Sequence, residues 1–371
     1  MSDASDRFGR EARGLLDRLN RYHGRQLTLM EVCGTHTVSA ARSGLRSLLP
    51  EQIRLVSGPG CPVCVSPVGY VDHALALARE PDVIIATFGD LVRVPGSASG
   101  NAATAAPSLA SARSEGADVR VVYSPLDAIA LARGALDRQV VFLGVGFETT
   151  APAVAASILR AVEQGLSNFS VLAAAKAIPP AMDALLRAGE LGIDGFLCPG
   201  HVSVIIGSRA YEPLARDHGV PCAIAGFEPV EILRGLVALV AQVEAGVARV
   251  DNCYPGAVTA DGNGRAREVM ARVLEPVDSR WRGLGEIPRS GLAIRPELAA
   301  FDAARRFTVD LPPPVEPSGC RCGDVLRGVI DPADCGLFGE VCNPEQPQGA
   351  CMVSSEGACA ARFHFTNGVS R

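Results

Sequence analysis

QVVFLGVGFETTAPAVAASILRAVEQG, residues 139–165, is the stretch that best indicates the fold class. Its first eight residues are apolar almost throughout, which is typical of a strand buried on both faces of a parallel sheet. A turn containing glycine and proline follows, and then an alanine-rich segment that favours a helix. This order of strand, turn and helix is the repeating unit of an α/β protein.

The same pattern recurs along the first 250 residues or so. Apolar runs followed by turns are predicted to be strands at 27–32, 53–57, 82–88, 118–124, 139–146, 169–175, 195–200 and 221–227. Such a series suits two doubly wound, mostly parallel sheets. The irregular spacing between the runs disfavours the alternative, a single eight-stranded barrel.

We expect this chain to form two α/β domains and a smaller cysteine-rich C-terminal domain. The α/β domains are assigned to residues 1–150 and 151–252, and the remainder to 253–371. The last region begins with helical stretches near 263–275 and 295–306, before the proline-rich linker LPPPVEP at 311–317. The N-terminal helix is expected to pack against this region.

The composition describes a globular chain. Of its 371 residues, 48% are hydrophobic and 20% charged, and the formal net charge of −5 gives no basic footprint for nucleic acid. The charged N-terminus is unlike a signal peptide, and no apolar run approaches the ~18 residues of a membrane span. We therefore expect a cytoplasmic protein with neither nucleic acid nor membrane as a partner. In that compartment, twelve cysteines point to metal or redox chemistry.

Reactive side chains follow five of the predicted strands. They occur in the motifs EVCGTHT (31–37), GPGCPVC (58–64), GFETTAP (146–152), CPGHVS (198–203) and GFEP (226–229). Ligand sites of open α/β sheets lie beyond the carboxyl ends of the strands. We therefore predict a functional cleft lined by the reactive residues of these motifs, which are Cys33, His36, Cys61, Cys64, Glu148, His201 and Glu228.

Each motif also has a simpler interpretation. The CxxC pair Cys61 and Cys64 resembles a thioredoxin-type redox pair, but it could equally be half of a zinc site or a buried structural element. Cys33 and His36 could be a buried thiol beside a hydrogen-bonded histidine. Glu148 could cap the helix that follows it.

The C-terminal tail carries the strongest signal. Its thiols, with no histidine among them, are Cys320, Cys322, Cys335, Cys342, Cys351 and Cys359. Tetrahedral zinc and a [4Fe–4S] cluster both accept four thiolates, and the spacings match neither a zinc ribbon nor the bacterial ferredoxin pattern. Two thiols remain for disulfide chemistry. The scattered cysteines Cys198, Cys222 and Cys253 are assigned to the core.

Taken in order, several motifs closely resemble those of the HypD family of [NiFe]-hydrogenase maturation proteins. They are EVCGTHT, SGPGCPVCV, GFETTAP, CPGHVSVIIG and GACMVSSEGACAA. The resemblance implies an iron–sulfur scaffold that works with the small chaperone HypC to assemble the Fe(CN)₂CO unit of the hydrogenase active site. Cyanide would arrive from HypE with HypF, and the finished unit would pass to the hydrogenase large subunit.

The resemblance also implies roles for individual residues. Cys33 would bind the iron under assembly, with His36 beside it, and Cys61 and Cys64 would be the other essential thiols. In the tail, the cluster ligands would be Cys320, Cys335, Cys342 and Cys359, and the redox dithiol beside them Cys322 with Cys351.

These roles are chemically consistent. Thiolates suit a low-spin iron that carries cyanide and carbon monoxide, and we expect a lowered thiol pKa at glycine-rich strand ends to help supply them. Cys61 and Cys64 either relay electrons from the cluster by thiol exchange through Cys322 and Cys351, or bind the iron themselves.

Two other functions stay open on the residues. One is a cluster-dependent disulfide reductase that acts on a small protein partner, and the other is a binding module with structural zinc in its tail. A dinucleotide enzyme is disfavoured because no GxGxxG follows the first strand.

Overall fold

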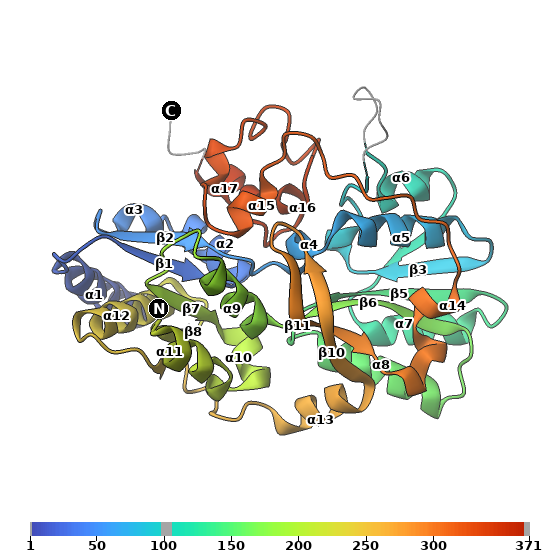
Figure 1. Cartoon of the computed structure of the whole chain (residues 1–371), viewed down its shortest axis with the longest axis horizontal. Coiled ribbons are helices and arrows are strands. Elements are labelled where there is room, and N and C mark those ends of the chain that lie inside the picture. Colours follow the sequence, from blue (N-terminus) through green and yellow to red (C-terminus); the bar gives the residue numbers. More distant parts are fainter. Residues whose placement is uncertain (1, 98–105, 367–371) are drawn as a thin grey trace.

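The computed structural model describes residues 2–97 and 106–366, and it has two open, mostly parallel sheets (Figure 1). The first sheet is entirely parallel, with the order β2 (Ile53–Ser57), β1 (Leu27–Glu31), β7 (Gly195–Pro199), β8 (Cys222–Ala225) and β9 (Val250–Asn252). The second has the order β10 (Leu274–Trp281), β11 (Gly285–Ile294), β6 (Phe169–Lys176), β5 (Gln139–Gly146), β3 (Val83–Thr87) and β4 (Asp118–Val121). The predicted α/β class is confirmed, and open sheets replace the alternative of one barrel.

The two sheets do not correspond to the expected division at residue 150. Strands β5 and β6 pair side by side across that position, and β1 pairs with β7, with Leu29 opposite Gly195. The expected domains 1–150 and 151–252 are therefore corrected: the chain starts the first sheet, builds the parallel part of the second, and returns to finish the first. Strands that are apolar on both faces give no indication of which strand lies beside them.

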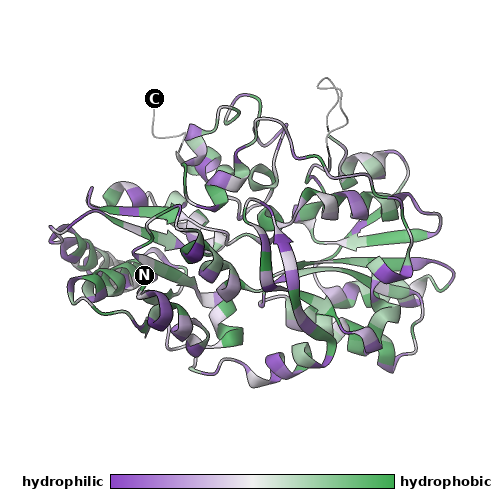
Figure 2. Ribbon diagram, viewed as in Figure 1, coloured by the Kyte–Doolittle hydropathy of each residue, from purple (hydrophilic) through white to green (hydrophobic). Residues whose placement is uncertain are grey.

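A β-hairpin that the sequence analysis missed completes the second sheet. Strands β10 and β11 are antiparallel, and β11 pairs with β6 in a region expected to contain only helices and linkers. Partly buried and exposed positions alternate along much of β10, because one face of the hairpin contacts solvent. Figure 2 shows hydrophilic residues along this hairpin, in contrast to the hydrophobic central strands. A search for continuous apolar runs does not detect such strands.

The helices follow the expected alternation with the strands. The α-helices are α1 (Ser2–Asn20), α2 (Gly34–Arg42), α3 (Leu45–Leu48), α4 (Pro62–Val65), α5 (Val68–Arg79), α6 (Leu109–Ser114), α7 (Pro125–Gly134), α8 (Ala151–Glu163), α9 (Ile178–Ala188), α10 (Gly200–Ile206), α11 (Glu212–His218), α12 (Pro229–Glu244), α13 (Gly264–Val273), α14 (Ala303–Arg306), α15 (Cys322–Leu326), α16 (Ala350–Val353) and α17 (Ala358–Thr366). The 3₁₀ helices are η1 (Gly89–Leu91), η2 (Ser208–Tyr211), η3 (Pro296–Phe301) and η4 (Pro332–Asp334).

Helix α1 differs from the expectation. It packs on α12, beside the first sheet, and not on the C-terminal region. The ion pair between Glu11 and Arg234 joins these two helices, and Leu19 is buried in the same hydrophobic cluster as α12. The amphipathic α1 is thus a cover for one face of the first sheet.

The central strands of both sheets are buried on both faces. Along β1, Leu29 and Met30 lie in different hydrophobic clusters, and along β3 the neighbours Ile84 and Ile85 do the same. This alternation is the one expected of covered parallel strands. The cluster with Met30 and Ile85 also contains Cys351 of the tail, so it joins the two sheets and the C-terminal region into one core.

The C-terminal region lies over the middle of the molecule, between the two sheets (Figure 1). Helices α15 and α16 pack on α4, and α17 packs on α2. The segments after β1 and β2 therefore meet the tail. Within the described ranges, no helix is long and apolar enough to cross a membrane.

Candidate functional site

The ends of four strands bring motif residues to one edge of the first sheet. The loops with Cys61, Cys33, His201 and Glu228 follow β2, β1, β7 and β8, which is the order of these strands in the sheet. Glu148 follows β5 of the other sheet. The parallel arrangement explains how residues up to about 200 positions apart in the chain become neighbours.

Cys33 lies between β1 and α2, and the loop after β2 packs directly on its backbone. Gly34 donates its N–H to the Gly60 carbonyl at 3.0 Å. A Cβ atom on Gly60 would lie 2.2 Å from the backbone nitrogen of Cys33, so only glycine allows this approach. Burial raises the pKa of the Cys33 thiol to about 12, which corrects the expectation of a lowered pKa. The glycine-rich turn therefore buries the Cys33 thiol and does not expose it to solvent.

His36 is fully buried in the first turn of α2. Its Nε2 donates to the Gly226 carbonyl at 2.9 Å, so the proton is on that nitrogen and Nδ1 keeps a free lone pair. Nδ1 is buried without a partner, and burial lowers the pKa of the imidazole. His201, in contrast, is exposed and stacks on Phe227 with 3.9 Å between ring centroids.

A buried ion pair at the end of β1 was missed by the sequence analysis. Glu31 is paired with Arg46, and both contact Ser57: its hydroxyl accepts from Arg46 at 2.7 Å and donates to Glu31 at 2.9 Å. Glu31 Oε2 and Arg46 Nε are buried without hydrogen-bond partners. The available signal was an acidic residue at the end of an otherwise apolar strand, because buried carboxylates need a partner.

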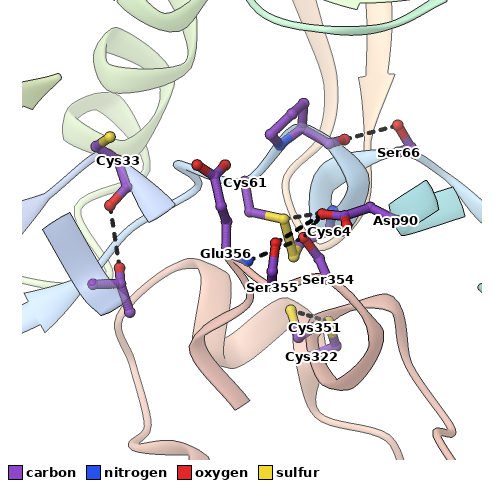
Figure 3. Close-up of a disulfide and its surroundings, with 12 residues drawn as sticks. Cys33, Cys61, Cys64, Ser66, Asp90, Cys322, Cys351, Ser354, Ser355 and Glu356 are labelled. Carbon is purple, nitrogen blue, oxygen red and sulfur yellow. Dashed lines mark hydrogen bonds between the residues drawn. A yellow bond between two sulfur atoms is a disulfide. The ribbon is translucent and has the colours of Figure 1, made fainter. Parts of the chain in front are cut away.

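Cys61 and Cys64 form a disulfide across the first turn of α4 (Figure 3). Cys61 precedes the helix, and its sulfur accepts the N–H of Cys64 at 3.1 Å. Both residues are buried. A buried disulfide at the start of a helix suits the redox interpretation of this CxxC motif and the structural interpretation alike.

All six tail cysteines line one small cavity. Apolar side chains, including Leu337, Phe338 and Met352, complete its wall. The sulfurs of Cys322 and Cys351 lie 2.7 Å apart. Hydrogen bonds from Cys320 and Cys351, assisted by the charge of Arg282, hold the pKa of the Cys322 thiol well below its usual range.

The donor set of this cavity offers more thiols than either a zinc ion or a [4Fe–4S] cluster needs. Around tetrahedral zinc, four thiolates lie ~3.8 Å apart, whereas in a [4Fe–4S] cluster each thiolate binds a different iron and the sulfurs are farther apart. No three Cys, His, Asp or Glu side chains of the described residues converge as the ligands of one ion would. Six thiols around one apolar cavity therefore fit ligation by four thiolates, with two thiols to spare.

The loop between α16 and α17 connects the tail to both sheets. Thr35, two residues after Cys33, donates to Glu356 at 2.8 Å, and burial raises the pKa of this carboxyl. Ser354 and Ser355 donate to Asp90 of η1 at 3.1 Å each. Figure 3 shows Glu356 between Cys33 and the Cys61–Cys64 disulfide, with Cys322 and Cys351 on the other side of that disulfide. The loop thus contacts both the helix that follows Cys33 and η1 of the other sheet.

Comparison with known proteins matches this chain over nearly its whole length. The HypD family model, described as "Hydrogenase formation hypA family", covers residues 10–366. The chain belongs to the HypD family. It is 50% identical over 347 residues to the hydrogenase maturation factor HypD of Azotobacter vinelandii, covering 92% of this chain and 90% of that protein.

Other HypD-family relatives are nearly as similar. The hydrogenase maturation factors HypD of Cupriavidus necator and Escherichia coli are 46% and 44% identical to it, each over 92% of this chain and 90% of the relative. The motif resemblance is therefore confirmed, and the chain is a hydrogenase maturation factor of the HypD family.

Glu148 and Glu228 of the family motifs have positions that suggest structural roles. Glu148 accepts the N–H of Ile178 at 3.0 Å, so it caps α9 and not the helix that follows it. Burial raises its pKa to about 7. Glu228 is exposed at the start of α12. The carboxylate that fixes this loop belongs to Glu231, which accepts the N–H groups of Phe227 and Glu228 at 2.8 and 3.0 Å.

The scattered cysteines lie apart from the tail cavity. Cys198 and Cys222 are buried in the core on the neighbouring strands β7 and β8. Cys253 is partly buried just after β9. These positions agree with a packing role.

Proposed function

We propose that this HypD-family chain is a scaffold on which, together with HypC, the Fe(CN)₂CO unit of the [NiFe]-hydrogenase site is assembled. HypE, with HypF, would deliver cyanide, and the hydrogenase large subunit would receive the finished unit. The observation that carries the proposal is the packing of the elements that hold the sulfur groups: α15 and α16 pack on α4, and Gly34, next to Cys33, bonds to Gly60, next to Cys61. The chain would act as an assembly platform with redox chemistry of its own.

Cys33 is the proposed ligand of the iron under assembly. Its thiol is protonated in the free chain because burial raises its pKa, so binding to iron must release that proton. The backbone amides of Thr35 and His36 face the sulfur and would stabilise the thiolate once it forms. The thiol thus stays unreactive until a metal replaces its proton.

The Cys61–Cys64 disulfide is the proposed electron acceptor beside Cys33. As a disulfide, neither sulfur can ligate iron, so any direct role as a ligand requires prior reduction. Helices α15 and α16, which carry Cys322 and Cys351, pack on α4. A dithiol at Cys322 and Cys351 would reduce this disulfide by exchange, with transfer of two electrons and two protons.

The remaining tail thiols are the proposed cluster ligands, Cys320, Cys335, Cys342 and Cys359. When bound there, a [4Fe–4S] cluster would supply single electrons at low potential. The protein would contribute the apolar wall of the cavity, which limits access of water to the sulfurs. Cys322 and Cys351 form the part of the cavity wall that faces α4.

A set of cysteine variants tests this assignment. The chain would be purified anaerobically from cells that also produce HypC, HypE and HypF, and its infrared spectrum recorded for cyanide and carbonyl bands. We expect Cys33→Ser to lose these bands while it keeps the iron and sulfide of the tail cluster. The buried, remote Cys222→Ser is the matched control and should keep both.

Three results would contradict the proposal. Diatomic bands of wild-type intensity in Cys33→Ser would exclude Cys33 as the iron ligand. Wild-type bands in both Cys61→Ser and Cys64→Ser would exclude these thiols as relay and as ligands. A cluster without diatomic bands in the wild type, with every partner present, would favour the disulfide reductase.

A further inference from the structure

A surface cleft gives access to one side of the tail cysteines. The turn of the β10–β11 hairpin, the end of the proline-rich segment and the start of α15 border this cleft, whose volume is about 280 Å³. Cys320 and Cys322 line both this cleft and the inner cavity, whereas Cys351 lines only the inner cavity. Cys322 is therefore the sulfur of its pair that an external molecule would reach first.

Arg282 is a buried, incompletely paired cation in the wall of this cleft. It is only 6% exposed, and its Nε and Nη2 atoms make no hydrogen bond. The Glu316 carboxylate lies 3.5 Å from Nε, which is too long for a good hydrogen bond, and its side chain is 55% exposed. A buried guanidinium without full pairing is costly, so the site favours an anion.

The backbone holds Arg282 in this position. Its N–H donates to the Val65 carbonyl at 2.8 Å, which attaches the hairpin turn to α4 and its disulfide. Gly283 has a φ of +80°, and a Cβ there would lie 2.3 Å from the Cα of Gly323, next to Cys322. Only glycine permits this contact. The hairpin turn is thus held against α4, which follows Cys61, and against α15, which begins at Cys322.

We propose that this cleft binds a thiol that carries a carboxylate, with the carboxylate on Arg282 in place of Glu316 and the sulfur directed at Cys322. The inference deepens the proposed function, on which it rests, because it names the class of reductant that reaches the Cys322–Cys351 pair from outside. The exposed Arg280, which also lines the cleft, adds a second positive charge.

The reaction balances as a thiol–disulfide exchange. The thiolate of the ligand attacks Cys322 in the oxidised Cys322–Cys351 pair, and Cys351 leaves as a thiolate that takes up a proton. A second ligand thiol then attacks the mixed disulfide and releases Cys322. The pair gains two electrons and two protons, and two ligand thiols become one disulfide.

Competitive alkylation tests the cleft without reference to hydrogenase maturation. The anaerobically purified full chain, with its pair reduced, is treated with iodoacetate or with the neutral iodoacetamide, and modification of Cys322 is followed by mass spectrometry. We expect Arg282→Gln to lower the ratio of the two rates about tenfold, and Glu316→Gln to raise it severalfold. A change in the thiolate fraction of Cys322 acts on both reagents alike and cancels in the ratio.

Matched controls lie on the same hairpin. Arg289→Gln and Glu286→Gln change exposed charges that do not line the cleft, and they should leave the ratio unchanged. An unchanged ratio in both Arg282→Gln and Glu316→Gln would overturn the proposal. Because Glu316 is exposed, its variant keeps the test decisive even if Arg282→Gln fails to fold.

A second measurement distinguishes small thiols from protein thiols. The oxidised chain is reduced with glutathione, with the neutral 2-mercaptoethanol, or with thioredoxin, each with and without Arg282→Gln. We expect Arg282→Gln to slow reduction by either glutathione or thioredoxin about tenfold, and to leave reduction by 2-mercaptoethanol unchanged. The reductant that is slowed identifies the source of the thiol. Equal slowing of reduction by all three reductants would overturn the anion site. If the chain shows the selective slowing but carries no diatomic bands, only its role in maturation is contradicted.

Discussion

Replacing Glu148 by glutamine tests how the protein accommodates a carboxyl group in its core. Oε1 of Glu148 accepts the N–H of Ile178, whereas Oε2 is buried without a partner. Burial raises the pKa of Glu148 from 4.5 to about 7. Since one pKa unit corresponds to ~1.4 kcal/mol, ionising this group costs about 3 kcal/mol more in the folded chain than in the unfolded chain.

The pH dependence follows from this difference. Between pH 4.5 and 7 the folded chain retains the proton on Glu148 while the unfolded chain has lost it, so the free energy of unfolding falls as the pH rises through this range. Glutamine keeps an oxygen for Ile178 and has no charge at any pH. We therefore expect Glu148→Gln to gain about 3 kcal/mol relative to wild type between pH 4.5 and 8.

Urea unfolding under reducing conditions, at several pH values, measures this change. Any constant offset from the added amide group does not vary with pH and can be subtracted. Glu163→Gln, at the exposed end of α8, is the matched control and should follow the wild type. Parallel curves for wild type and Glu148→Gln would refute the reasoning, because they would show that Glu148 is already ionised in the folded chain near pH 5.

Three further predictions concern the supports of the site. Glu231→Ala removes the acceptor for two N–H groups before α12 and should destabilise the chain by about 1–2 kcal/mol in thermal unfolding, unlike Glu244→Ala at the exposed end of that helix. Asp90→Asn should increase hydrogen exchange in residues 350–358, because it weakens the contacts with Ser354 and Ser355; unchanged exchange would contradict that role. Cys222→Ala should lower the unfolding free energy by about 1–2 kcal/mol without loss of iron or sulfide, and loss of either would assign Cys222 to the site.

Much of the fold could be predicted because its strongest signals are local. The strand at 139–146 was predicted at its observed bounds, since a run of buried apolar residues ends in a clear turn. The pairing of β1 with β7 could not be predicted in this way, because it depends on how distant helices pack. The β10–β11 hairpin was missed for the opposite reason: its solvent-exposed face interrupts the apolar pattern.

The candidate site shows the same division. Cysteines at strand ends are conspicuous in a sequence, so Cys33 and the CxxC pair could be predicted to belong to the functional site. The residues that support them could not be predicted in this way. Glu356, for example, accepts a hydrogen bond from Thr35, which lies 321 positions earlier in the chain. Arg282 is likewise one arginine among many in the sequence. Its burial beside the start of α15 depends on the missed hairpin and on the contact between Gly283 and Gly323.

The most direct test of the central claim is to purify the chain anaerobically, alone and together with HypC, to count iron, sulfide and zinc, and to record the infrared spectrum. The account predicts about four irons and four sulfides in the chain alone, held by the tail thiols. It predicts one further iron with cyanide and carbonyl bands in the complex. About one zinc per chain, with no sulfide and no diatomic bands, would contradict it and return the tail to a structural role.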